Sequence, residues 1–89
     1  MKKFTYKVEL ENGLHARPAG KITTACKQFE SDINLYIDEN RGADGKRLLS
    51  IMALGARCGD EIAIEIEGSD EEEAAKALQT VLNNLGNEE

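Results

Sequence analysis

Apolar and polar residues alternate in three segments of the chain. The first runs from Phe4 to Leu10, and the other two carry isoleucine or leucine at every second position of 33–37 and 62–66. Successive side chains of a strand point to opposite faces of a sheet, so a period of two places all the apolar residues on one face. The pattern predicts three half-buried strands. In the last of them, carboxylates make up almost all of the other face.

Two further segments have the apolar spacing of a helix. The first begins at Ala16, and its apolar stripe consists of Ala19, Ile22, Thr23, Cys26 and Phe29. The second follows Ser69, and its stripe consists of Ala74, Ala77, Leu78, Val81, Leu82 and Leu85. Residues three and four positions apart share one face of a helix, so each stripe is expected to face the core. Ser69 with Glu72 predicts a capping box at the start of the second helix, and Gly86 predicts its C-terminal end.

The middle of the chain has weaker patterns. Asp38–Gly45 is rich in turn residues and gives only a faint signal for a short strand. Leu48–Gly55 is short and apolar, so its pattern fits either a helix or a strand. Antiparallel strands that alternate with helices, in a chain of 89 residues, predict a two-layer α+β fold with one core. We expect residues 1–89 to form a single domain.

Charge and composition disfavour several functions. The chain has 11 basic and 17 acidic residues, a net charge of −6, which argues against a nucleic-acid-binding surface. It has no apolar run of membrane-spanning length and no apolar stretch of a secretory signal, so we expect a cytoplasmic protein without membrane insertion. Much of the acidity lies in the C-terminal half. The segment through Lys27 is locally basic, which suits contact with acidic partners.

The cysteines are too few and too scattered to suggest special chemistry. Cys26 and Cys58 lie far apart and form no C-x-x-C motif. We expect both to be reduced thiols that fill small spaces in the fold. Together with the only histidine, they provide too few ligands for a metal site. We therefore expect neither a metal nor a cofactor.

One segment concentrates the candidate chemistry. Asn12–Ala19 contains the only histidine and the only proline of the chain, His15 and Pro18. Proline is tolerated in the first turn of a helix, so His15 is predicted to lie where the first helix begins. Unpaired N–H groups and the helix dipole favour an anion there, and the guanidinium of Arg17 suits phosphate oxygens. These features indicate a histidine that accepts a phosphoryl group. The alternative is a histidine that merely caps the helix.

The run Gly13-Leu14-His15-Ala16-Arg17-Pro18-Ala19 resembles the active-site signature of HPr. HPr is the histidine-containing phosphocarrier family of the bacterial phosphoenolpyruvate-dependent sugar phosphotransferase system. The resemblance covers nearly the whole chain, because further segments follow in the family's order: Ile33–Leu35, Lys46–Gly55, Gly59–Ile62 and Ser69–Glu73. It implies an open-faced sandwich, in which a four-stranded antiparallel sheet carries three helices on one face. It also makes the apolar segment after Lys46 a short helix.

The resemblance implies roles for the residues of the motif. His15 becomes the phosphoacceptor through Nδ1, and Arg17 neutralises phosphate oxygens. Ala16, Arg17 and Pro18 form the phosphate-binding start of the helix. The protein is then a phosphoryl carrier rather than a stand-alone enzyme. Its expected donor is phosphorylated enzyme I, its acceptors are sugar-specific IIA components, and we expect a monomer.

The resemblance also implies a partner-binding surface that joins the first helix to the short second one. The expected residues are Gly20, Lys27, Arg47, Leu48, Leu49 and Met52. Core packing is the alternative for the two leucines. In many relatives a serine at the start of the second helix is phosphorylated by a dedicated kinase. Arg47 occupies that position here and Ser50 lies three residues on, so regulation through that serine is not expected.

Three functions compete at this point. The first is the general phosphocarrier of the sugar system. The second is an HPr-like paralogue in a nitrogen-related or other regulatory phosphorelay, which the missing serine keeps open. The third is a plain interaction module in which His15 only caps a helix, and the motif argues against it.

Overall fold

Four antiparallel strands form one sheet in the order β1-β4-β2-β3. The computed structural model describes the backbone of residues 1–88 and the side chains of residues 1–86. The strands are β1 (Lys2–Lys7), β2 (Asp32–Asp38), β3 (Arg41–Asp44) and β4 (Glu61–Glu67). The helices are α1 (Ala16–Cys26), α2 (Leu48–Ala53) and α3 (Glu71–Asn84), and a 3₁₀ turn over Leu85–Glu88 follows α3.

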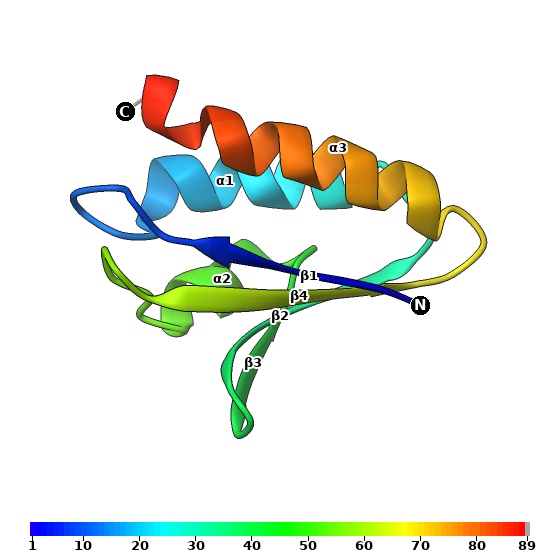
Figure 1. Ribbon diagram of the computed structural model, residues 1–89, viewed down its shortest axis with the longest axis horizontal. Coiled ribbons are helices and arrows are strands. Elements are labelled where there is room, and N and C mark those ends of the chain that lie inside the picture. The colour runs from blue at the N-terminus through cyan, green and yellow to red at the C-terminus, as the bar shows by residue number, and fades with distance from the viewer. Residues whose placement is uncertain (89) are drawn as a thin grey trace.

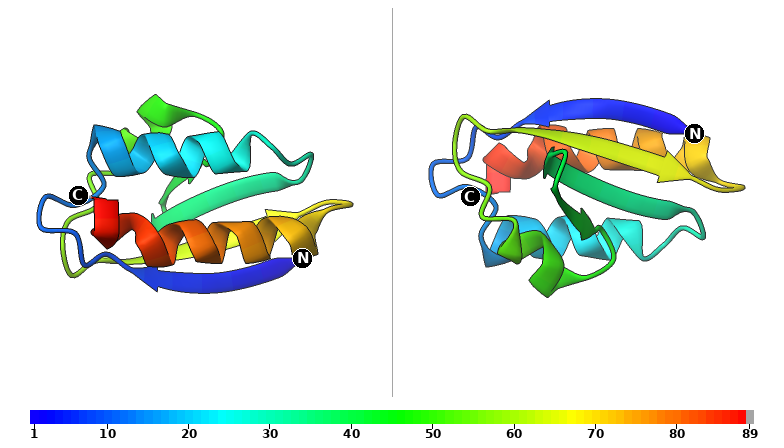
Figure 2. Two further views of the ribbon diagram at one scale, coloured as in Figure 1. Left: turned by 90° about the horizontal axis from the view of Figure 1, so that it is seen from above. Right: turned by 90° about the horizontal axis from the view of Figure 1, so that it is seen from below.

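The helices form the second layer. α1 and α3 run side by side over one face of the sheet (Figure 1). α2 packs against α1 and against β3 at the edge of the sheet, so that α1 lies between α2 and α3 (Figure 2). This arrangement confirms the predicted α+β class with four antiparallel strands and three helices. None of the helices in the described part of the chain is long and apolar enough to cross a membrane.

The core lies between the sheet and the helices. Ile62, Ile64 and Ile66 of β4 are at most 1% exposed and point toward α1 and α3, as their alternation with acidic residues predicts. Ile22 of α1 and Leu78 of α3 are equally buried on the facing layer. Burial of such a side chain stabilises the fold by roughly 1.5–3 kcal/mol. The weak strand signal within Asp38–Gly45 corresponds to a real strand, β3.

Two elements end earlier than their apolar patterns suggest. β1 stops at Lys7, although Val8 and Leu10 beyond it are still buried. α1 stops at Cys26, so Phe29 packs on the core from the following turn and not from the helix. In both cases the apolar residues do face the core. In each case, buried residues continue beyond the last residue with regular strand or helix hydrogen bonds. The apolar pattern reports which residues are buried, not where those hydrogen bonds end.

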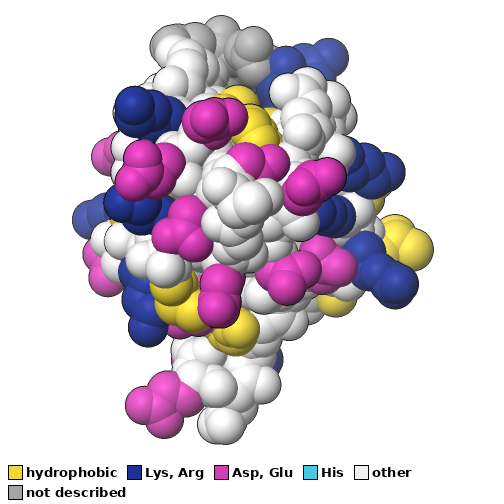
Figure 3. Space-filling view, turned by 90° about the vertical axis from the view of Figure 1, so that its right-hand side faces the viewer, with side chains coloured by type: hydrophobic (Ala, Val, Ile, Leu, Met, Phe, Trp, Pro, Cys, Tyr) yellow, Lys and Arg dark blue, Asp and Glu magenta, His cyan; other side chains and the backbone are white. Residues whose placement is uncertain are grey.

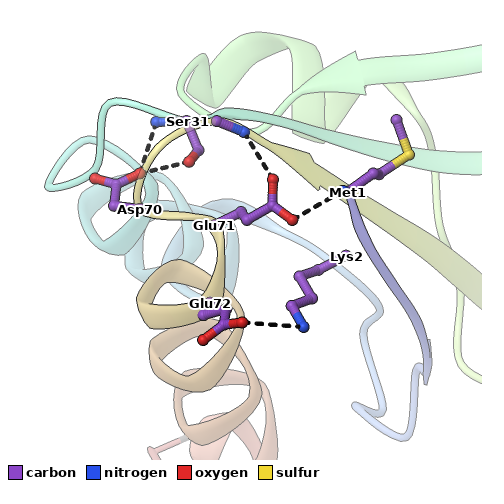
Figure 4. Close-up of polar contacts among 7 residues, drawn as sticks. Met1, Lys2, Ser31, Asp70, Glu71 and Glu72 are labelled. Carbon is purple, nitrogen blue, oxygen red and sulfur yellow. Dashed lines mark hydrogen bonds and ion pairs between the residues drawn. The ribbon is translucent and has the colours of Figure 1, made fainter.

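The predicted ends of α3 are wrong. Asp70, not Ser69, precedes the helix, and no side chain caps it. The carboxylate of Asp70 instead accepts hydrogen bonds from the backbone N–H and the hydroxyl of Ser31, the former at 2.9 Å (Figure 4). It also accepts one from the backbone N–H of Glu30 at 2.9 Å. Gly86 is not a left-handed cap, because the 3₁₀ turn continues the chain past α3.

Candidate functional site

His15 is the residue immediately before α1. Its backbone is extended (φ −83°, ψ −171°), and its carbonyl accepts the first helical hydrogen bond, from the N–H of Ala19 at 3.0 Å. The imidazole makes no capping hydrogen bond to the helix, and the residue is half-buried. The side chain therefore does not do what a capping side chain does, which weakens the view of His15 as a cap alone.

The first turn of α1 is arranged to receive an anion. Ala16 and Arg17 are exposed, and the N–H groups at the start of a helix have no partner within that helix. The first turn contains no acidic residue that would oppose a negative charge. Pro18 is buried and has no N–H, so it can start the helix but cannot donate to a phosphate. Of the three predicted phosphate-binding residues, only Ala16 and Arg17 can donate.

Gly13 places a second loop beside His15. Its φ is +70°, and a Cβ at this position would lie 2.3 Å from the carbonyl oxygen of Ala56 and 3.1 Å from the Cα of Arg57. The N–H of Leu14 donates to that same Ala56 carbonyl at 3.1 Å. The loop between α2 and β4 therefore packs directly on the loop that carries His15, and both lie at one end of the molecule (Figures 1 and 2).

The opposite end of the molecule is acidic. α3 begins there with Glu71, Glu72 and Glu73, and Asp and Glu side chains occupy the centre of that face (Figure 3). The long axis thus separates the acidic start of α3 from the end that carries His15 and Arg17. The locally basic N-terminal segment is not gathered at the His15 end, because its Lys2 lies at the acidic end and pairs with Glu72 of α3 at 3.6 Å (Figure 4).

The expected partner residues fall into two groups around α1. Leu48, Leu49 and Met52 of α2 are exposed to 38%, 79% and 38%, so the structure excludes core packing for the two leucines. Arg47 is the exposed residue before α2, and its Nε lies 3.9 Å from a carboxylate oxygen of Asp44.

The remaining two residues of that set lie on α1 or at its end. Lys27 is exposed just after the last residue of the helix. Gly20 lines a groove between α1 and α3 that begins at Ala16 and Arg17, which is the flank of α1 away from α2. The structure therefore does not bring Gly20 together with the exposed residues of α2.

The two cysteines differ in environment, and both are free thiols. Cys26 is buried in α1, where desolvation raises the pKa of its thiol to about 12. Cys58 is exposed in the loop between α2 and β4, so the expectation that it fills a small space is wrong. The sequence carried a signal for this exposure, because Gly55 and Gly59 flank Cys58 and glycines are typical of surface turns.

Comparison with known proteins places the chain in one family. The model of the family described as PTS HPr component phosphorylation site matches residues 2–84. The phosphocarrier protein HPr of Treponema pallidum is 38% identical over 85 residues, which cover 96% of each chain. That of Mycoplasma pneumoniae is 38% identical over 82 residues, or 92% of this chain and 93% of the relative. The crystal structure of HPr-C-His from Thermoanaerobacter tengcongensis superposes with a TM-score of 0.89 at 36% identity, covering 100% of this chain and 99% of the other.

Proposed function

The chain belongs to the HPr family of phosphocarrier proteins of the phosphotransferase system, and from that premise we propose that His15 carries the phosphoryl group. In this proposal phosphorylated enzyme I is the donor and sugar-specific IIA components are the acceptors. The observation that supports it most is the position of His15. His15 stands directly before the first turn of α1, which carries the exposed Ala16 and the exposed, cationic Arg17.

The transfer follows from this arrangement. A ring nitrogen of His15, Nδ1 in this family, attacks phosphorus, the bond between phosphorus and the donor residue breaks, and the donor leaves with the electron pair. The N–H groups of Ala16 and Arg17 and the Arg17 guanidinium then face the phosphoryl oxygens, where the helix dipole adds a favourable field. Protonation of the phosphorylated ring makes it a good leaving group for the next acceptor. An exposed first turn lets two proteins approach phosphorus in line.

The experiment is incubation with enzyme I and phosphoenolpyruvate, followed by intact mass and by acid treatment. We expect a mass gain of one phosphoryl group that acid removes, because a phosphoramidate is acid-labile whereas a phosphoserine is not. His15→Ala should take up no phosphate while its thermal unfolding stays cooperative. Undiminished labelling of His15→Ala would refute the proposal.

Arg17 supplies a second, graded test. Removal of an exposed cation should change the free energy of unfolding by less than about 1 kcal/mol, since Arg17 lies on the surface. Arg17→Ala should nevertheless slow phosphoryl transfer clearly. Equal transfer rates for the variant and the parent would make Arg17 a bystander.

Arg47 keeps a second function in view, an HPr-like carrier in a nitrogen-related or other regulatory phosphorelay. It stands directly before α2, where many members of the sugar system carry the regulatory serine. The two functions differ in the acceptor. Phosphate on His15 should pass rapidly to a sugar-specific IIA component if the first is right, and preferentially to a regulatory acceptor if the second is.

A further inference from the structure

The loop between α2 and β4 is fixed to the segment that leads to His15. The N–H of Gly59 donates to the Val8 carbonyl at 2.7 Å, and the N–H of Val8 donates to the Asp60 carbonyl at 2.8 Å. The bond from Leu14 to Ala56 closes the other side of the same contact. Three backbone hydrogen bonds and the close approach at Gly13 therefore set the position of residues 56–60 relative to His15.

Arg57 is the cation of this loop. Its N–H donates to a carboxylate oxygen of Asp60 at 2.8 Å, and the N–H of Asp60 donates back to its carbonyl at 2.9 Å. This reciprocal pair makes a tight turn, and it directs the Asp60 carboxylate to the backbone of the loop. The residue is exposed, and in the described part of the chain no carboxylate forms an ion pair with its guanidinium.

The net charge of the protein makes such a cation useful. A chain of net charge −6 repels a partner whose phosphorylated residue is itself an anion. The acidic start of α3 lies at the far end of the long axis, away from His15 (Figure 3), whereas the loop before His15 carries only the exposed carboxylates of Glu9 and Glu11. A fixed arginine at that end, on an element other than α1, further favours approach of the anion from the productive side.

We infer that Arg57 is a partner-recognition residue, which steers a negatively charged phosphorylated protein onto His15 without itself contacting the transferred phosphoryl group. The inference rests on the proposed function. It separates the two arginines by role. Arg17 belongs to the helix start that would hold the phosphoryl oxygens, whereas Arg57 acts on the encounter between the two proteins.

The test compares Arg57→Gln and Arg57→Glu with the parent chain in steady-state phosphorylation by enzyme I and phosphoenolpyruvate. Arg57→Gln should raise the KM for this protein about threefold to tenfold at low salt, with kcat unchanged, because a rim charge acts on association. Arg57→Glu should raise KM further. Added salt should reduce the difference in KM between each variant and the parent chain, since salt screens the charges.

The matched control is Arg41→Gln in β3. Arg41 is also an exposed arginine, its Nε lies 3.2 Å from a carboxylate oxygen of Asp38, and it sits in the β2–β3 hairpin away from the His15 end. This variant should leave KM unchanged. Hydrolysis of the phosphorylated histidine is measured on each purified phosphoprotein, and Arg57→Gln should match the parent.

The outcomes are distinguishable. An unchanged KM for both Arg57 variants would overturn the inference alone, as would an effect confined to kcat or to phosphohistidine hydrolysis, because that would place Arg57 on the phosphoryl group. No label on the parent chain would overturn the proposed function, and the inference with it. Both variants should fold, because the guanidinium is exposed and the turn is closed by backbone groups and Asp60.

Discussion

At the scale of single residues, Gly13 has a left-handed backbone conformation and lies so close to the Ala56 carbonyl that a side chain would not fit between them. Gly13→Ala should therefore lower the free energy of unfolding by about 1–3 kcal/mol, through backbone strain and displacement of the Ala56 carbonyl. Because the displaced loop abuts His15, phosphoryl transfer should slow as well. Urea titration and the enzyme I assay measure the two effects.

Gly20 offers the matched glycine. It lies inside α1, its φ is not positive, and apart from the nearby backbone of its own helix and its chain neighbours no atom lies within 4 Å of the position that a Cβ would take. Gly20→Ala should raise the free energy of unfolding by up to ~1 kcal/mol, since alanine is the better helix former. An equal decrease in the free energy of unfolding for Gly13→Ala and Gly20→Ala would contradict this prediction. It would mean that both positions need a flexible backbone and that the close contact at Gly13 is not the cause.

At the scale of elements, the start of α2 bears on regulation. Arg47 precedes the helix and cannot accept phosphate from a serine kinase, and Ser50 is half-buried inside the six residues of α2. In the relatives the phosphorylated serine stands at the start of this helix, which is the position of Arg47 here, whereas Ser50 is the third residue of α2 and its side chain is half-buried. We expect an ATP-dependent HPr serine kinase to leave the protein unmodified. Phosphopeptide mapping checks this, and stoichiometric phosphate on Ser50 would contradict it.

Sequence reasoning succeeded where one local pattern decides the element. The alternation around Ile64 and the apolar stripe through Ile22 depend only on which face is buried, and both elements formed with the predicted face buried, although α1 ends before Phe29. It failed at the start of α3, because the Asp70 carboxylate bonds to Ser31, 39 positions away, and no local motif reports such a contact. Ser69 and Glu72 had the right spacing for a cap, but tertiary contacts took precedence.

The sequence predicted only part of the candidate site, again because a local motif does not report contacts between distant segments. The motif around His15 is contiguous, and it supplied the imidazole, the guanidinium and the helix start from sequence. The loop that carries Arg57 reaches the site through backbone hydrogen bonds to Val8 and Leu14. Gly13 was the one signal of this contact, since a motif glycine often marks a close backbone approach.

At the scale of the whole molecule, Asp70 links the start of α3 to the start of β2. The Ser31 hydroxyl, followed by the Glu30 N–H, lowers the pKa of the Asp70 carboxyl below its ordinary 3.8. A lowered folded-state pKa adds stability above the unfolded value, and this contribution is lost as the pH falls through the folded value. Below about pH 4 the protein should lose this contribution to its stability, and Asp70→Asn should weaken the dependence of stability on pH in that range.

Urea midpoints across an acidic pH series measure this effect. Ser31→Ala removes the hydroxyl partner of the same carboxylate, so its destabilisation and that of Asp70→Asn should be less than additive in the double variant. Asp70→Asn with the same acid dependence as the parent would show that other carboxyls govern acid unfolding. Glu71, whose pKa is lowered by a hydrogen bond from the Met1 ammonium at 2.8 Å, is the next candidate.

The docking of residues 56–60 against the His15 loop also provides a built-in place for a reporter. Cys58 is exposed in that turn, whereas the Cys26 thiol is buried and its pKa is raised to about 12. Alkylating dyes react with thiolates, so at neutral pH a maleimide fluorophore should attach to Cys58 alone. Because backbone hydrogen bonds hold the turn against Val8 and Leu14, the dye would stay at the end of the molecule that carries His15. Its emission would then follow the arrival and departure of a doubly charged phosphoryl group in real time, without radioactivity.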